Sequence, residues 1–220
     1  WVFNTGKFSA KLKGNPDGLE VSGLGEFQLT RGGKHVVSVR RVPGPLAKVD
    51  PKDKQPENKG DPGTRWALEF DGKGTHVEIP SLTFDFSHPI TIEATVQPGE
   101  PKGNEFLVSA PFRAGLFRQG DQFGFGFYST VFGQQTTPQG RVAQNGTLRI
   151  TGIWNRSSIS VHANGKMIAQ VPYQRDPDKE KQWPFILGAS KHLNGAVCDV
   201  FTGRILEVRI SKVARAGSLD

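Results

Sequence analysis

The sequence predicts an all-β protein whose main part is a sandwich of two antiparallel sheets. In three segments, residues 67–72, 90–98 and 201–215, apolar and polar side chains alternate. In 90–97, Ile90, Ile92, Ala94 and Val96 face one way, and Thr91, Glu93, Thr95 and Gln97 face the other. A period of two is the pattern of a strand with one buried face. The 27 Gly and 15 Pro favour many turns, and 15 Phe and 4 Trp supply a core for 220 residues.

The first 64 residues differ in composition from the rest. Short β-like runs occupy residues 7–12, 25–30 and 35–42, and Arg31-Gly-Gly-Lys34 is expected to form a hairpin turn. Residues 43–64 are rich in proline and charge and poor in large apolar groups, so we expect a linker there. This division predicts a small β-hairpin region at 1–42, a linker at 43–64 and a sandwich at 65–220.

Strand patterns recur from residue 66 onward. Asp71-Gly72 is expected to form the turn between the first two of these strands. Asn164-Gly165 is expected to form a two-residue hairpin turn and is the strongest short-range hairpin signal in the chain. The expected strands are residues 66–70, 75–80, 90–96, 105–109, 122–128, 146–152, 157–163, 166–171, 184–188 and 204–210.

The Phe70-Asp-Gly72 opening, the Asn164-Gly165 hairpin, Ile186-Leu-Gly188 and a last strand with Glu207 and Arg209 resemble the laminin-G-like jelly roll. This is a branch of the concanavalin A-like lectin/glucanase superfamily, and the resemblance covers about residues 65–215. Residues 18–42 are similar to the end of PEGA-like β-repeats. The resemblance implies a jelly-roll sandwich with a short N-terminal β appendage, from a larger bacterial envelope or secreted protein with neighbouring domains.

Charge and composition exclude several function classes. The net charge is +7, and residues 1–65 carry 12 Lys/Arg against 7 Asp/Glu, so the sandwich is nearly neutral. The basic residues are scattered without interleaved aromatics, which argues against nucleic acid as a partner. No apolar run reaches the length of a membrane span. Cys198 has no base or cationic neighbour that would activate it.

The sequence motifs predict that the protein is not an enzyme. Glucan hydrolases of this superfamily cluster carboxylates on one strand, whereas Glu93 and Glu207 are each alone on their strands. We interpret Glu207 as the ion-pair partner of Arg209. The five histidines have no metal-ligand spacing, and no Gly-x-Ser-x-Gly motif is present.

No cofactor is required by the sequence, and one structural calcium remains open as an alternative. Its candidate ligands are Asp71, Asp121 and Asp199, although Asp71 is also explained as a turn residue. Pentraxins place acidic calcium ligands directly after the Ile-Leu-Gly strand. Here the corresponding residues are Ser190, Lys191 and His192, so that site is not carried over.

The expected function is noncatalytic binding of a glycan or another surface ligand. The alternatives are a structural or protein–protein interaction module without a small ligand and, third, a polysaccharide-active enzyme. Residues in loops at one edge of the sandwich are the candidate contacts: Tyr128, Trp183, His192, Asn194 and Asp199. Glycan recognition is expected to place at least two exposed rings in one patch. Tyr173 is also expected to be exposed. In Phe123-Gly-Phe-Gly-Phe127 either the rings fill the core, or the glycines leave a bare strip for a sugar.

Overall fold

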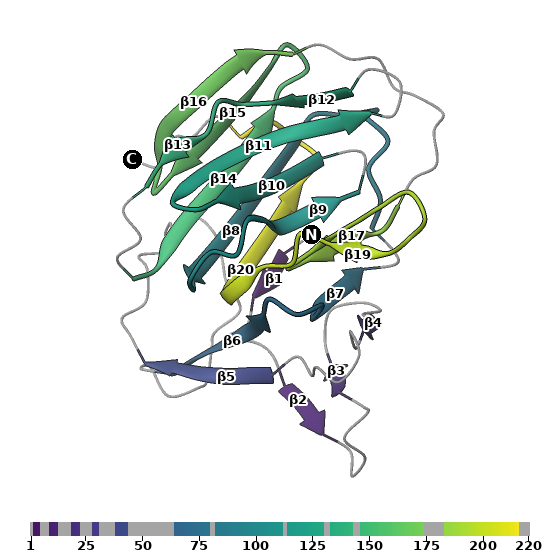
Figure 1. Cartoon of the computed structure of the whole chain (residues 1–220), viewed down its shortest axis with the longest axis vertical. Coiled ribbons are helices and arrows are strands. Elements are labelled where there is room, and N and C mark those ends of the chain that lie inside the picture. The colour runs from purple at the N-terminus through teal and green to yellow at the C-terminus, as the bar shows by residue number, and fades with distance from the viewer. Residues whose placement is uncertain are drawn as a thin grey trace.

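The computed structural model describes residues 2–4, 9–12, 19–22, 28–30, 38–43, 64–79, 82–111, 114–129, 133–142, 146–173 and 183–215. It contains two large antiparallel sheets packed face to face, and no helix occurs in these ranges (Figure 1). The predicted all-β two-sheet jelly-roll sandwich is therefore confirmed.

One layer, here called the β20 sheet, has the strand order β16-β15-β14-β8-β20-β6-β5, and β1 also pairs with β20. Its strands are β1 Val2–Asn4, β5 Ser38–Pro43, β6 Thr64–Asp71, β8 Ile90–Pro98, β14 Leu148–Trp154, β15 Ser158–Ala163, β16 Lys166–Pro172 and β20 Thr202–Ser211.

The other layer, the β11 sheet, has the order β12-β11-β10-β9-β17-β7-β4, with β13 paired to β11. Its strands are β4 Gln28–Thr30, β7 His76–Ile79, β9 Asn104–Ala110, β10 Ala114–Gln119, β11 Gln122–Ser129, β12 Gly133–Thr136, β13 Gly140–Arg141 and β17 Phe185–Leu187. Two small hairpins, β2 Ser9–Leu12 with β3 Leu19–Ser22 and β18 Ser190–Lys191 with β19 Val197–Cys198, complete the strands.

The N-terminal strands β4 and β5 join different layers. β4 pairs with β7 in the β11 sheet, and β5 pairs with β6 in the β20 sheet. The turn expected at 31–34 and the linker segment 44–63 lie outside the described residues. The division of the chain into a 1–42 region, a linker and a sandwich stays a prediction.

The core lies between the two layers and follows the predicted alternation. Ile90, Ile92, Ala94 and Val96 of β8 all belong to the buried cluster. The rings of Phe123, Phe125 and Phe127 enter the same cluster from β11. Trp154 is 1% exposed and packs edge-on against Phe84, Phe86 and Phe127, so these four rings form an aromatic group within the core.

Gly124 of β11 and Gly115 of the neighbouring β10 are both covered by aromatic rings. A Cβ placed on Gly124 would lie 2.6 Å from the ring of Phe117, and one on Gly115 would lie 2.2 Å from the ring of Phe106. These two rings, with centroids 5.6 Å apart, cover the backbone on the outer side of the sheet. The interpretation that the three β11 rings fill the core is therefore confirmed.

The turns predicted at Asn164-Gly165 and Asp71-Gly72 form as expected. Asn164 and Gly165 have φ values of 48° and 82° and connect β15 to β16, the positive-φ pair that a two-residue hairpin requires. Asp71 Oδ1 accepts hydrogen bonds from Lys73 N at 2.9 Å and Thr75 Oγ1 at 3.1 Å, and Gly72 has a φ of 68°. The side chain of Asp71 thus stabilises the turn between β6 and β7.

Candidate functional site

The β18–β19 hairpin gathers three of the five residues predicted to contact a ligand. His192 and Asn194 are exposed in its turn, and Trp183, which precedes β17, is half-buried beside it. A Cβ on Gly195 would lie 3.9 Å from Cη2 of Trp183, so the indole reaches the turn. The turn is fixed by hydrogen bonds from Gly195 N to His192 O and from Ala196 N to Asn194 Oδ1, at 2.8 and 2.9 Å.

The other two predicted contacts are placed differently. Asp199 follows β19 with a φ of 49°, and its carbonyl oxygen accepts a hydrogen bond from Phe106 N at 2.8 Å. Asp199 therefore lies at the opposite end of the paired residues of the hairpin from the turn at 192–196. The backbone of Tyr128 pairs with Gln134 in β12, while its side chain lies outside the described part of the chain.

An ion pair anchors this hairpin to the β11 sheet. Lys191 Nζ bonds Glu78 Oε1, and Nε2 of the buried His76 lies 3.3 Å from the same oxygen. Burial raises the pKa of the Glu78 carboxyl, but hydrogen bonds and charge from Lys191 and His76 outweigh burial and lower the pKa below its ordinary value. The ionised carboxylate is thus the form that holds the hairpin.

The aromatic side chains are less exposed than the sequence suggested. Tyr173 was expected to be exposed, but it is half-buried and stacks on Phe127 with centroids 4.8 Å apart. Trp183 and Phe106 are also half-buried, and no aromatic side chain is fully exposed among those that the structure describes. The expected patch of two exposed rings is absent from that part of the chain.

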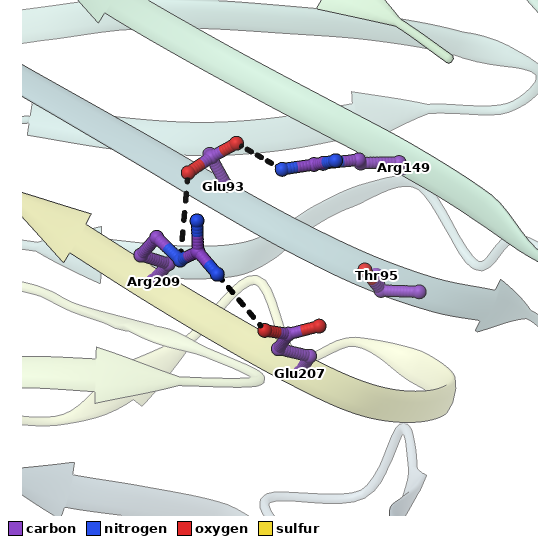
Figure 2. Close-up of a pocket in the computed structure, with 5 residues that line it drawn as sticks. All are labelled: Glu93, Thr95, Arg149, Glu207 and Arg209. Atoms are coloured by element: carbon purple, nitrogen blue, oxygen red, sulfur yellow. Dashed lines mark hydrogen bonds and ion pairs between the residues drawn. The ribbon is translucent and has the colours of Figure 1, made fainter. Parts of the chain in front are cut away.

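A separate pocket lies on the outer face of the β20 sheet (Figure 2). It holds about 170 Å³ of empty space, part of it open to solvent, and is lined by Glu93, Thr95, Arg149, Glu207 and Arg209. These side chains come from β8, β14 and β20 and project from the same side of the sheet. Only about 10 Å³ of it is free for the centre of a water molecule, so the pocket has room for about one water.

Alternating charges run across this pocket. Arg149 Nη2 donates a 2.6 Å hydrogen bond to Glu93 Oε1, and Arg209 Nε lies 3.9 Å from Glu93 Oε2. Arg209 Nη2 lies 3.7 Å from Glu207 Oε1, which confirms the ion pair predicted from the sequence. Glu93 is 9% exposed, and its Oε2 accepts no hydrogen bond.

Glu93 and Glu207 are each alone on their strands, as expected, yet both line this pocket. The register aligns Glu93 with Arg209 and Thr95 with Glu207 across β8 and β20, after a bulge between Ile205 and Glu207. Each strand does carry one glutamate, so the sequence pattern on either strand alone gives no sign of the pair. Both carboxylates face guanidinium groups, unlike the proton-donating acid and the second carboxylate that glycoside hydrolysis uses.

The candidate metal ligands and Cys198 were also located. Asp121 is exposed and forms a 3.9 Å ion pair with Arg141, and Asp71 is engaged in its turn. No group of three His, Cys, Asp or Glu side chains suited to a metal occurs within the described ranges. The structural calcium stays a prediction.

The thiol of Cys198 is not activated. Burial, with Asp199 adding to it, raises the pKa of this thiol to about 12, so the thiolate is scarce at neutral pH.

No helix in the described part of the chain is long and apolar enough to cross a bilayer.

A family model described as the Concanavalin A-like lectin/glucanases superfamily matches residues 71–218. No curated protein matches the sequence.

Several solved structures are similar. The CBM40 of the Ruminococcus gnavus IT-sialidase, bound to α2,3-sialyllactose, has a TM-score of 0.55 and 14% identity over 69% of this chain and 92% of that chain. The binding domain of Paraclostridial Mosquitocidal Protein 1 has a TM-score of 0.58 and 14% identity, over 96% and 49%. A heptameric SAP-like pentraxin from Limulus polyphemus has a TM-score of 0.53 and 10% identity, over 69% and 77%. At such identities the likeness concerns the fold.

Proposed function

This chain belongs to the Concanavalin A-like lectin/glucanases superfamily, and we propose that it is a noncatalytic carbohydrate-binding module of a larger envelope or secreted protein. One observation carries the proposal: the half-buried indole of Trp183 lies against a rigid turn that exposes His192 and Asn194. A flat apolar ring can pack on the apolar face of a sugar, while polar groups beside it bond the hydroxyls.

Three further findings support this function. The hairpin is held to the sheet by Lys191 and Glu78, so its turn is presented by a rigid scaffold. The similar CBM40 structures contain sialyllactose, which makes carbohydrate a reasonable ligand class to test first. The two glutamates of the outer pocket are paired with arginines, which supports a noncatalytic role.

A glycan array that includes neutral and anionic sugars tests the proposal. We expect His192→Ala to weaken binding of the positive glycans by about tenfold, because an exposed contact is lost without disturbing the core. His88→Ala is the control, since the His88 ring contacts Phe84, with centroids 5.5 Å apart, and His88 is not part of the hairpin. Equal affinity of both variants for every bound glycan would contradict binding at the hairpin.

A second candidate is a protein–protein interaction module without a small ligand. Leu193 at the tip of the hairpin is 63% exposed, which is unusual for a large apolar side chain in a turn. An array on which no glycan binds, combined with loss of a partner on Leu193→Ser, would favour this alternative.

A further inference from the structure

We propose that His76, acting through the carboxylate of Glu78, holds the β18–β19 hairpin more firmly at mildly acidic pH than at mildly alkaline pH. The inference rests on the proposed function, because this hairpin carries the predicted ligand contacts His192 and Asn194, and it concerns how that site is regulated. It starts from the ring of His76, which is 1% exposed and has both nitrogens close to oxygen atoms.

The contacts of this ring show where its first proton lies. Nδ1 of His76 is 2.8 Å from the carbonyl oxygen of Gly74, which can only accept, so Nδ1 carries a hydrogen and donates it. Nε2 is 3.3 Å from Oε1 of Glu78. A neutral imidazole has one N–H, and its other nitrogen is an acceptor. In the neutral ring the lone pair of Nε2 therefore faces a carboxylate oxygen, and the contact is repulsive.

A second proton turns this repulsion into attraction. An imidazolium donates from both nitrogens, so Nε2 bonds the carboxylate of Glu78 while Nδ1 keeps its bond to Gly74. Hydrogen bonds between charged groups are stronger than those between neutral groups. Water does not replace or screen the contact, because the His76 ring is buried.

Glu78 transmits the change to the hairpin. Its Oε1 also bonds Nζ of Lys191 in β18, and the side chains of Glu78 and Lys191 are 15% and 14% exposed. Burial opposes ionisation, but Lys191 and His76 hold the pKa of Glu78 below its ordinary value, so the carboxylate is charged throughout the range in which histidines titrate. Protonation of Nε2 fixes this carboxylate, which then gives Lys191 an acceptor in a constant position. The three residues thus form a clamp on the hairpin.

The elements around His76 carry few charged side chains. The strands that pair with β7 are β4 and β17, and neither residues 28–30 nor residues 185–187 include a titratable side chain. The turn before β7 contains Asp71 and Lys73. Asp71 Oδ1 accepts from Lys73 N at 2.9 Å, and the side chain of Lys73 is exposed.

The hairpin has titratable groups of its own. Burial, with Asp199 adding to it, raises the pKa of the Cys198 thiol to about 12, so this thiol stays neutral at mildly acidic and mildly alkaline pH. His192 is exposed in the turn and is a predicted ligand contact. Because histidines ordinarily change charge between about pH 5 and 8, ligand affinity alone does not separate His192 from the clamp. The test therefore measures the hairpin itself.

Amide hydrogen exchange of the whole chain without a ligand, at about pH 5.5 and about pH 8, tests the clamp. We compare protection factors, which correct for the pH dependence of exchange itself. For the turn amides His192 N and Gly195 N, we expect about tenfold higher protection at the lower pH, because a charge-assisted bond is gained. Asn164 N, which bonds Arg149 O at the β15–β16 turn, is the internal reference and should not change.

Two variants make the test specific to His76. His76→Gln keeps an N–H donor that does not titrate, so we expect equal protection of the turn amides at the two pH values. His162→Gln is the matched control, because His162 is a half-buried histidine of β15 in the other sheet, and it should respond to pH as the wild type does. If His76→Gln does not fold, the wild type at the two pH values still decides.

Equal protection of the turn amides at both pH values in the wild type would overturn the proposal, and so would an unchanged response in His76→Gln. The glycan array, run at the same two pH values, tests the proposed function separately. An array without any bound glycan, together with the expected exchange response, would reject carbohydrate binding and sustain the clamp. Where glycans bind, we expect a stronger signal at the lower pH that His76→Gln abolishes, and a signal independent of pH would overturn the regulatory role.

Discussion

Two clusters of arginine and glutamate occupy opposite environments in this sandwich. Arg118 of β10 and Glu105 of β9 are both 0% exposed and pair inside the protein. Arg149, Glu93, Arg209 and Glu207 lie on the outer face of the β20 sheet. The residue types are the same, yet the first cluster is closed and the second has an opening.

The buried pair is fully hydrogen-bonded. Arg118 Nη1 donates to Gly99 O at 3.0 Å and Nη2 donates to Thr202 O at 2.9 Å, while its Nε bonds Glu105. The other oxygen of Glu105 accepts from Lys102 N at 3.2 Å, and the guanidinium lies 5.1 Å from the centroid of the Phe201 ring. Because Gly99 directly follows β8 and Thr202 begins β20, Arg118 of β10 ties the two layers together.

The two clusters differ in how completely their polar atoms are hydrogen-bonded, and this distinguishes a structural ion pair from a candidate ligand site. A buried charge is tolerated when every polar atom has a partner, and then little remains for a ligand. On the outer face one carboxylate oxygen of Glu93 is buried without a hydrogen bond, although the residue lines a small pocket.

The buried pair should dominate stability. We expect Arg118→Met to lower the free energy of unfolding by about 3–5 kcal/mol, because Glu105 would remain buried without its partner. Urea denaturation measures the change. The double variant Arg118→Met/Glu105→Leu should recover most of the loss, since two apolar side chains leave no unpaired charge. A single variant within about 1 kcal/mol of wild type would be incompatible with a structural role for the pair.

The outer cluster should matter much less for folding. We expect Glu93→Gln to cost about 1 kcal/mol, because Arg149 can turn to solvent when its partner loses charge. The same urea measurement applies. A cost equal to that of Arg118→Met would show that the outer cluster is also structural, and the contrast would be lost.

The Glu78–Lys191 pair is an intermediate case, with side chains 15% and 14% exposed. The pKa of Glu78 is lowered in the folded protein, so its stabilising contribution is complete above the unfolded value of about 4.3 and is lost as the pH falls through the lower folded value. The difference in unfolding free energy between wild type and Glu78→Gln should therefore shrink below about pH 4.3. A difference that stays constant from pH 6 to about pH 2.5 would contradict this assignment.

Salt should change the stability cost of a substitution in the outer cluster more than the cost of a substitution in the buried pair. This effect is the smallest of those expected. At about 1 M NaCl the Debye length falls to roughly 3 Å, which screens partly exposed pairs more than buried ones. We expect the cost of Glu93→Gln to decrease in salt and the cost of Arg118→Met to stay unchanged, both by urea denaturation. The opposite dependence would mean that Arg118 is reached by solvent.

Sequence patterns located most strands of the sandwich but missed β10. Its inward side chains are Ala114, Leu116 and Arg118, and its outward ones include Phe117. A charged residue inside and an aromatic residue outside reverse the usual pattern, so alternation gives no signal there. The short strands β12, β13, β18 and β19 also escape prediction, because two to four residues are too few to show a period.

Local sequence patterns were enough to identify the buried side of β8, the position of the Asn164-Gly165 hairpin and the superfamily, because strand periodicity and turn chemistry depend on neighbouring residues. Only the tertiary structure decided which side chains meet. The strand order and the bulge in β20 bring Glu93, Arg149 and Arg209 together, and chain packing brings Trp183 to the hairpin. Cross-strand neighbours are set by register between segments far apart in the chain, which local patterns do not encode.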